Sequence, residues 1–545
     1  VNGQGGVVGN CCGYLTLKDI TVSTANPTDS SKECKIAAVA NNRVDTDGSE
    51  KGVGGLAGAV TSKAKLTLNN CTVSNITVVA EKGNAKTTNM NFPVSAGGAV
   101  GYSTGTILVD GTLTTKDVTV TTYAGRAALG DKTREQVKHF SAGGVVGCLR
   151  GKLTTTSNDY VSTITAESNM VTGMYAGGFA GTVASYDSSD LPIKLQGKAG
   201  SKLVDGGTVT GGQAAGGLFG QLGMNTGSLY LNPEKGTTPL VVSGVTVSGM
   251  DAGGVAGSIS ASKDTRIENV QVKGCTITAS IPKNGNALVA GGSAAGGFVG
   301  ACTLTGTLKL YNSSLDTNKI LYQTDSTTLQ DKECGSEENF LSVGGVIGTV
   351  RSNAGTGTIQ ADNLVLSKDN QVGVRQGADE NGKVQLIQKK DSSYQLADLA
   401  APTGKTNQEA LNNLVDSYGL FVGTVIGTLN STNITINMMN LQLSQDNLPV
   451  VDVGRTGSQS SYAYRQNCHI LYGAENSHTA QDNLARMKQE VENSSGRYDN
   501  TTDISKLLSF YRLNQVGDWS TGNTPQTPEE IWKDVYPLTL DMDGG

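Results

Sequence analysis

Histidine, aromatic residues and long apolar runs are scarce in this sequence, and each scarcity excludes a class of protein. Only three histidines occur, His139, His469 and His478, and none belongs to an HExxH motif, which excludes a metalloprotease zinc site of that type. Neither a GxSxG elbow nor a P-loop is present. Because no apolar run reaches about 18 residues, we expect no membrane span.

The chain also has no excess of positive charge, which argues against nucleic acid as a partner. Charged residues make up 17% of the chain and the net charge is −6. Lysine and arginine are scattered, with no basic stripe and no interleaved aromatic residues. Nucleic-acid binding therefore is not expected.

The cysteines have no CxxC spacing, so they indicate neither a zinc site nor a regular disulfide framework. The nine are Cys11, Cys12, Cys34, Cys71, Cys148, Cys275, Cys302, Cys334 and Cys468. We predict that Cys71, Cys148, Cys275 and Cys302 are small core residues. A disulfide from Cys34 to a neighbouring coil remains an alternative.

Glycine is abundant, with 72 residues, and much of it lies in a repeat. The motif is Gly-Gly, two apolar residues and Gly, and in the tenth copy the second glycine is replaced by threonine. Successive copies are 34 to 79 residues apart, which predicts a repeat protein with inserted loops. The ten copies begin at Gly5, Gly54, Gly97, Gly143, Gly177, Gly216, Gly253, Gly296, Gly344 and Gly423.

The segments after the motif alternate apolar and polar residues, as in 15–22, 66–73 and 308–315. This alternation, broken by short corners with Asn or Asp, predicts strands that bury one face and turn from sheet to sheet. We therefore predict an all-β fold, a right-handed parallel β-helix. We expect the motif glycines to supply positive φ at corners or to admit a neighbouring backbone. One motif apolar residue should face inward, and the other should lie at a turn or the outer edge.

A mean repeat of about 46 residues is longer than one compact coil needs, so we expect one to two coils per repeat, or roughly ten to twenty in all. The variable remainder should project sideways as lateral loops. The expected insertions are 84–95, 127–141, 316–340 and 367–420, the last with a helix over 407–418.

The sequence changes character after about residue 445. Helical periodicity appears over 480–491 and 504–511, and Pro528 begins a third short helix. Because the open end of a solenoid needs a cover, we predict that 446–545 form a small α+β capping module. A ligand-binding module with Trp519 and Trp532 as stacking platforms is the alternative.

The repeats resemble the GLUG motif of large bacterial surface proteins, including adhesins. The resemblance rests on segments such as 96–101 (AGGAVG), 176–181 (AGGFAG) and 295–300 (AGGFVG), and it covers residues 1–445. It implies a cell-surface or secreted protein. We also expect the chain, which begins at Val1, to be a processed or excised piece of a larger one.

These observations predict a non-catalytic extracellular surface scaffold or adhesin. Its partner would be a host surface glycoprotein, a glycan or another copy of the chain. We assign no catalytic and no cofactor-binding residue. A filament or stalk subunit is an alternative.

The enzymatic alternative is a polysaccharide lyase or glycoside hydrolase, since parallel β-helices host such enzymes. A hydrolase would need two carboxylates beside the scissile bond. The candidate pairs are Asp110 with Asp117 and Asp187 with Asp190, although polar corners and loops explain both. No acidic pair is expected to stack from coil to coil. Two Asp-rich strings, 45–50 and 541–545, resemble the start of a calcium loop but lack its full ligand set.

Overall fold

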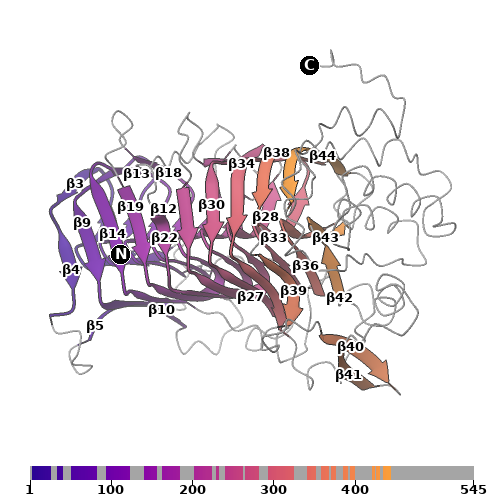
Figure 1. Ribbon diagram of the computed structural model, residues 1–545. Coiled ribbons are helices and arrows are strands. Elements are labelled where there is room, and N and C mark those ends of the chain that lie inside the picture. Colours follow the sequence, from indigo (N-terminus) through magenta and orange to yellow (C-terminus); the bar gives the residue numbers. More distant parts are fainter. Residues whose placement is uncertain are drawn as a thin grey trace, which may run out of the picture.

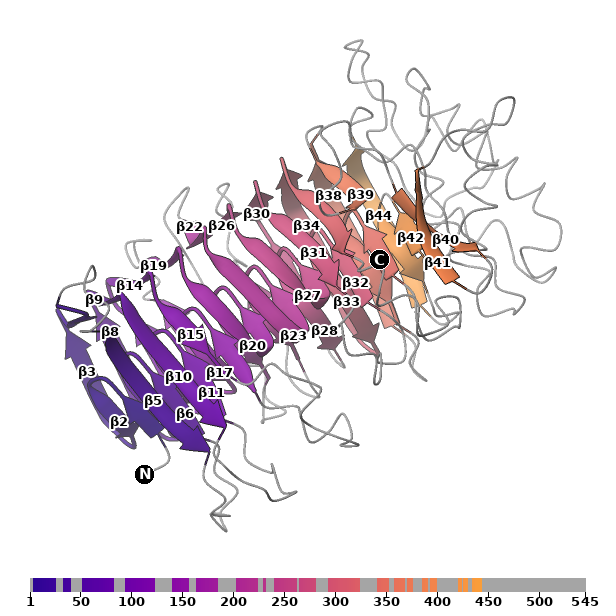
Figure 2. The ribbon, with the colours of Figure 1, turned by 90° about the horizontal axis from the view of Figure 1, so that it is seen from below.

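The computed structural model is a rod of stacked coils whose strands run parallel from one coil to the next (Figures 1 and 2). This confirms the all-β, parallel β-helix prediction. The residues that the structure describes are 3–25, 33–40, 51–82, 94–122, 140–155, 163–184, 202–223, 229–231, 240–261, 264–280, 293–323, 341–351, 357–367, 370–375, 385–390, 393–398, 420–423, 425–429 and 434–443.

Sheet B contains one strand from each motif copy, and its order follows the sequence. There is thus one coil per repeat, the lower limit of the predicted range, and ten coils span roughly 43 Å. The ten strands are β2 (Val8–Cys11), β7 (Ala57–Val60), β12 (Val100–Ser103), β17 (Val146–Leu149), β21 (Ala180–Val183), β24 (Phe219–Leu222), β28 (Ala256–Ala261), β33 (Val299–Leu304), β37 (Ile347–Val350) and β43 (Ile426–Leu429).

Sheet A precedes sheet B in each coil, and in several coils its strand is split into two by an insertion. Its strands are β1 (Gly3–Gly5), β5 (Cys34–Ala40), β6 (Lys51–Gly54), β10 (Ile76–Lys82), β11 (Val94–Gly97), β15 (Thr119–Thr121), β16 (Ser141–Gly143), β20 (Met170–Gly177), β23 (Thr208–Gly216), β27 (Thr246–Gly253), β31 (Thr276–Ser280), β32 (Ser293–Gly296), β35 (Lys319–Gln323), β36 (Leu341–Gly344), β39 (Gln371–Arg375) and β42 (Leu420–Gly423).

Sheets C and D complete the coil, and in the last coils one long strand runs through both positions. Sheet C has β3 (Tyr14–Lys18), β8 (Lys65–Asn69), β13 (Thr106–Val109) and β18 (Lys152–Thr155). Sheet D has β4 (Thr21–Ser23), β9 (Cys71–Ser74), β14 (Thr112–Lys116), β19 (Thr163–Glu167), β22 (Lys202–Asp205), β25 (Leu229–Leu231), β26 (Leu240–Ser243), β29 (Thr265–Glu268), β30 (Val270–Lys273), β34 (Thr307–Asp316), β38 (Gly357–Leu366) and β44 (Ile434–Leu443).

The described part of the predicted lateral insertion, 367–420, contains strands. Strand β39 pairs with β35 inside sheet A, and β40 (Gln385–Lys390) and β41 (Ser393–Asp398) form an antiparallel hairpin. Residues 371–375 therefore belong to sheet A, so the prediction that the insertion begins at 367 was wrong. The predicted helix over 407–418 and the whole C-terminal module, 446–545, lie outside the described residues.

The coils share one continuous apolar core, because alternate residues of every sheet point inward. Strand β8 illustrates the alternation, since Leu66 and Leu68 are fully buried and their neighbours are not. In every copy after the first, both motif apolar residues enter this core, as Leu218 and Phe219 do, so the prediction that one would lie outside was wrong for these copies. In the first copy Val7 is exposed. The chain bends between the motif glycines and sheet B, which turns both side chains inward.

The motif glycines are required by close packing of backbones, and none of those described has positive φ. A Cβ on Gly97 would lie 1.9 Å from the Val100 carbonyl oxygen of its own coil. A Cβ on Gly98 would lie 2.0 Å from the Gly144 carbonyl oxygen of the next coil. The close-approach prediction was therefore right for these positions and the positive-φ prediction wrong.

Positive φ occurs instead at two corners that recur along the rod. A left-handed residue is favourable for Gly, Asn and Asp, which dominate both rows. Between sheets C and D the row is Asp19, Asn70, Gly111, Asn269, Asn312 and Asn363. Between sheets D and A the row is Asn75, Asp117, Ser168, Gly206, Gly244, Gly274 and Thr317.

Candidate functional site

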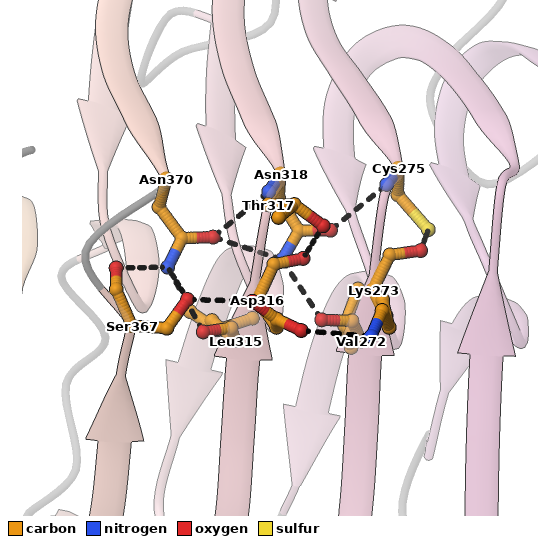
Figure 3. Close-up of polar contacts among 9 residues, drawn as sticks. All are labelled: Val272, Lys273, Cys275, Leu315, Asp316, Thr317, Asn318, Ser367 and Asn370. Carbon is orange, nitrogen blue, oxygen red and sulfur yellow. Dashed lines mark hydrogen bonds and ion pairs between the residues drawn. The ribbon is translucent and has the colours of Figure 1, made fainter.

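Buried asparagines bond one coil to the next at the corner between sheets D and A (Figure 3). The Asn318 side chain accepts from the Cys275 backbone N–H at 2.9 Å and donates to the Val272 carbonyl at 2.8 Å. Asn370 does the same one coil later, accepting from the Asn318 backbone N–H at 2.9 Å and donating to the Leu315 carbonyl at 2.9 Å. The two asparagines thus form a ladder along the corner, and the amide groups of both side chains are bonded within the chain itself.

A second polar layer lies between the second half of sheet A and sheet B, and we call it the A–B seam. Its side chains are buried but do not belong to the main core. The Ser141 and Thr182 hydroxyls lie 2.6 Å apart across it. The seam residues are Ser95, Ser141, Tyr175, Ala214, Asp251, Ala294 and Ser342 from sheet A, and Ala59, Tyr102, Cys148, Thr182, Gln221, Ala301 and Thr349 from sheet B.

A buried ion pair crosses two coils in this seam. Both Arg351 guanidinium nitrogens donate to the Asp251 carboxylate, at 2.6 and 2.7 Å, and the two side chains are only 9% and 1% exposed. Ala294 pairs in register with Asp251 on one side and with Ser342 on the other. Because alanine occupies the intervening coil, the arginine can extend along the seam, where the pair binds three coils together.

The first predicted carboxylate pair is not assembled. Asp110 precedes β14 and Asp117 follows it, so this five-residue strand keeps them at least about 13 Å apart. Glycoside hydrolases hold their two carboxyl groups about 5 to 9.5 Å apart. Asp187 and Asp190, and both Asp-rich strings at 45–50 and 541–545, lie outside the described residues.

An acidic pair that the sequence did not reveal stacks on the outer side of sheet D. Glu167 and Asp205 are neighbours in register on β19 and β22, so the prediction that no acids stack between coils was wrong. Each carboxylate forms an ion pair, since Lys116 Nζ lies 2.5 Å from Glu167 and Lys202 Nζ lies 2.8 Å from Asp205.

The protonation of Asp205 does not suit a general acid. Partial burial works against ionisation, but hydrogen bonds from Lys202 and Ser243 outweigh it and lower the pKa of Asp205. A general acid working near neutral pH needs a raised pKa. The hydrogen bond and charge of Glu167 likewise raise the pKa of Lys116, so this ammonium group stays protonated. The stacked acids therefore form a charged surface column.

None of the described cysteines forms a disulfide, and this includes Cys34, whose disulfide was the open alternative. Cys71, Cys148, Cys275 and Cys302 are buried, as predicted. Burial raises the pKa of Cys275 to about 11 and that of Cys302 to about 12, although the Arg351 charge opposes the second shift. Cys71, Cys275 and Cys302 are therefore core residues and not nucleophiles, whereas Cys148 is buried in the A–B seam.

The described strands of sheet A are interrupted in two groups of coils, one toward each end of the rod. The sheet A strand is interrupted at 41–50, 83–93 and 123–139 in the first coils, and at 281–292, 324–340 and 376–419 in the last. The breaks at 83–93 and 123–139 agree with the predicted insertions 84–95 and 127–141 within a few residues. The later two predicted insertions begin too early, since sheet A continues to 323 and to 375, and the breaks at 41–50 and 281–292 were not predicted. Between the two groups, β20, β23 and β27 each run through sheet A without a break.

The uninterrupted strands present a patch of small hydroxyl side chains, which we call the threonine window. Alternation places Val171, Val209 and Val247 in the core, so the residues beside them point outward. The threonine window comprises Met170, Thr172, Thr208, Thr210, Thr246 and Ser248. Met170 is 57% exposed, and Thr208, Thr210 and Thr246 are also exposed.

The comparisons with known proteins add no relative. No family model, no curated protein and no solved structure matches this chain. In the part of the chain that the structure describes, no cluster of three or more His, Cys, Asp or Glu residues could hold a metal ion. Over the same residues, no helix is long and apolar enough to cross a membrane.

Proposed function

We propose that this chain is a non-catalytic extracellular scaffold of the adhesin type, which presents a face of its solenoid to a partner. The observation that carries the proposal is the threonine window. It is an exposed, regular surface on a rigid support, and the chain's insertions leave sheet A on both sides of it. Binding surfaces commonly lie on such rigid elements flanked by variable loops.

We also propose that the coil is right-handed, that the protein is secreted or at the cell surface, and that a module caps the last coil. A right-handed coil follows the near-universal hand of parallel strand crossovers. The resemblance to GLUG repeats supports the cell-surface or secreted location. A capping module at 446–545 would cover the edge strands of the last coil, since exposed edges invite aggregation.

The partner is a host surface glycoprotein, a glycan or a second copy of the chain. To test the proposal, the purified chain is immobilised and exposed to glycans, to glycoprotein-bearing cell surfaces and to itself. Saturable binding that a charge introduced by Thr208→Lys weakens is the expected result. Binding to none of the three classes would refute the proposal.

The first coil favours self-association as a second candidate. Among the described residues, strands β1, β2, β3 and β4 each pair along one edge and have no described partner along the other. Tyr14 is 86% exposed and Val7 is 43% exposed beside those edges. End-to-end stacking of copies would make the chain a filament or stalk subunit. Light scattering tests it: mass that rises with concentration supports stacking, and a constant monomer mass up to millimolar concentration contradicts it.

Polysaccharide cleavage remains the enzymatic alternative, and none of the described carboxylate pairs favours it. The assay is incubation with uronate-containing and neutral polysaccharides, followed by detection of unsaturated products and new reducing ends. Turnover abolished by a single carboxylate substitution would replace the scaffold proposal with an enzyme.

A further inference from the structure

The hydroxyl groups of the threonine window belong to columns in strict register. Thr208 pairs with Met170 on one side and with Thr246 on the other, and beyond the window the column continues to Thr276 and then to Lys319. Thr210 pairs with Thr172 and Ser248 in a second column. Neighbouring strands are about 4.8 Å apart and residues i and i+2 about 6.6 Å apart, so the window is a grid with a short, fixed repeat.

The threonine window is uncharged, unlike the neighbouring face of sheet D. Its six outward residues are threonine, serine and methionine. Around the corner, sheet D carries the column of Lys116, Glu167 and Asp205, and further along the Lys273–Asp316 ion pair. An acidic ligand would be attracted to lysine or arginine, which the window lacks, so charge complementarity favours a neutral partner.

A peptide strand is disfavoured as the occupant. Peptides that add to a sheet bond to backbone groups at an open edge. Strand β23, in the middle of the window, is paired with β20 and β27 on its two sides. What remains for a ligand is side chains alone, namely hydroxyls that both donate and accept hydrogen bonds, threonine methyls and the Met170 thioether.

We propose that the threonine window binds an extended neutral glycan. Such a chain offers hydroxyl groups that donate and accept, together with C–H surfaces that pack on methyl groups, at spacings of a few ångströms. This inference names the partner for the binding face, and so it rests on the proposed scaffold function.

The test compares neutral glycans with uronate-containing and sialylated glycans in binding to three forms of the full chain. The first form is the wild type. The second is Thr208→Val, Thr210→Val and Thr246→Val, which removes three hydroxyls while preserving side-chain shape and strand propensity. The matched control, Thr16→Val, Thr67→Val and Thr154→Val, makes the same change on the outward side of sheet C. Circular dichroism and the thermal midpoint confirm that all three are folded.

The expected result is binding of neutral glycans by the wild type and the control, and at least about tenfold weaker binding by the window variant. Equal binding by the window variant, or binding of acidic glycans alone, would overturn the inference and leave the scaffold function in place. Binding of no glycan would also overturn it. In that case the cell-surface and self-association assays decide separately whether the scaffold proposal survives.

Discussion

The substitution Asn318→Val should uncouple two coils at the corner between sheets D and A. Valine occupies this corner in other coils, at Val118 and Val245, so the new side chain suits the backbone. The change removes the acceptor for the Cys275 backbone N–H and the donor for the Val272 carbonyl. Both groups are buried, and no water can replace the lost amide without a cavity.

The cost follows from those two orphaned groups. A buried donor or acceptor without a partner costs about 1 to 3 kcal/mol, so the two together cost about 2 to 6 kcal/mol. Burial of the valine side chain returns roughly 1.5 to 2 kcal/mol. We therefore expect a net destabilisation of about 2 kcal/mol at the middle of these ranges and at most about 4.5 kcal/mol, with the effect concentrated at one interface between coils.

Native-state hydrogen exchange measures this effect locally, which suits a repeat array whose unfolding need not be two-state. The Cys275 amide should exchange about thirtyfold faster in Asn318→Val, and at most about two-thousandfold faster. The control is Cys275→Val, which places the same side chain in the adjacent coil and keeps the Asn318 bond to the backbone N–H. If both variants protect this amide equally well, the asparagine ladder does not hold the coils together and the reasoning is wrong.

Three further predictions concern the backbone, the A–B seam and the surface charges. Gly98→Ala should leave little folded protein, because the new Cβ would meet the backbone of the next coil. Gly13→Ala is the control, since a Cβ there has no atom within 4 Å, and it should change the unfolding free energy by less than about 0.5 kcal/mol. Urea titration distinguishes the two variants. Arg351→Met should cost about 3 to 5 kcal/mol by leaving Asp251 buried and unpaired, and adding Asp251→Ala should restore most of it, which thermal unfolding would show. Since folding lowers the pKa of Asp205, this carboxylate stabilises the fold above the ordinary value of 3.8, and that stabilisation is lost as the pH falls through the lower folded value. Asp205→Asn should therefore flatten the plot of unfolding free energy against pH below pH 3.8. An unchanged profile would contradict this.

The strands and their faces could be predicted from local sequence, because they depend on period-two alternation. The segment 66–73, for example, gives strands β8 and β9 separated by a corner at Asn70. The number of coils per repeat could not be fixed from the mean spacing, since the insertions inflate it. The shortest interval, 34 residues from Gly143 to Gly177, is the better guide, because it leaves little room for two coils.

Contacts between coils were beyond sequence reasoning because they require the register. Glu167 and Asp205 are neighbours in space but lie one coil apart in the sequence, and Arg351 lies 100 positions from Asp251. Asn318 and Asn363 look alike in sequence, yet one follows a left-handed residue and points inward, while the other is itself left-handed and faces solvent. The threonine window likewise emerges only when the insertion sites are placed on the rod.

The central claim is that each motif contributes one coil to a single stack, and the distance between two spin labels tests it most directly. Thr77 and Lys319 stand in the same sheet A column, linked in register through Thr119, Met170, Thr208, Thr246 and Thr276. Labels introduced at these two positions by codon suppression should give one narrow distance of about 29 Å, six coil steps. A distance near 58 Å, as two coils per motif would give, or a broad distribution from separate lobes, would contradict the account.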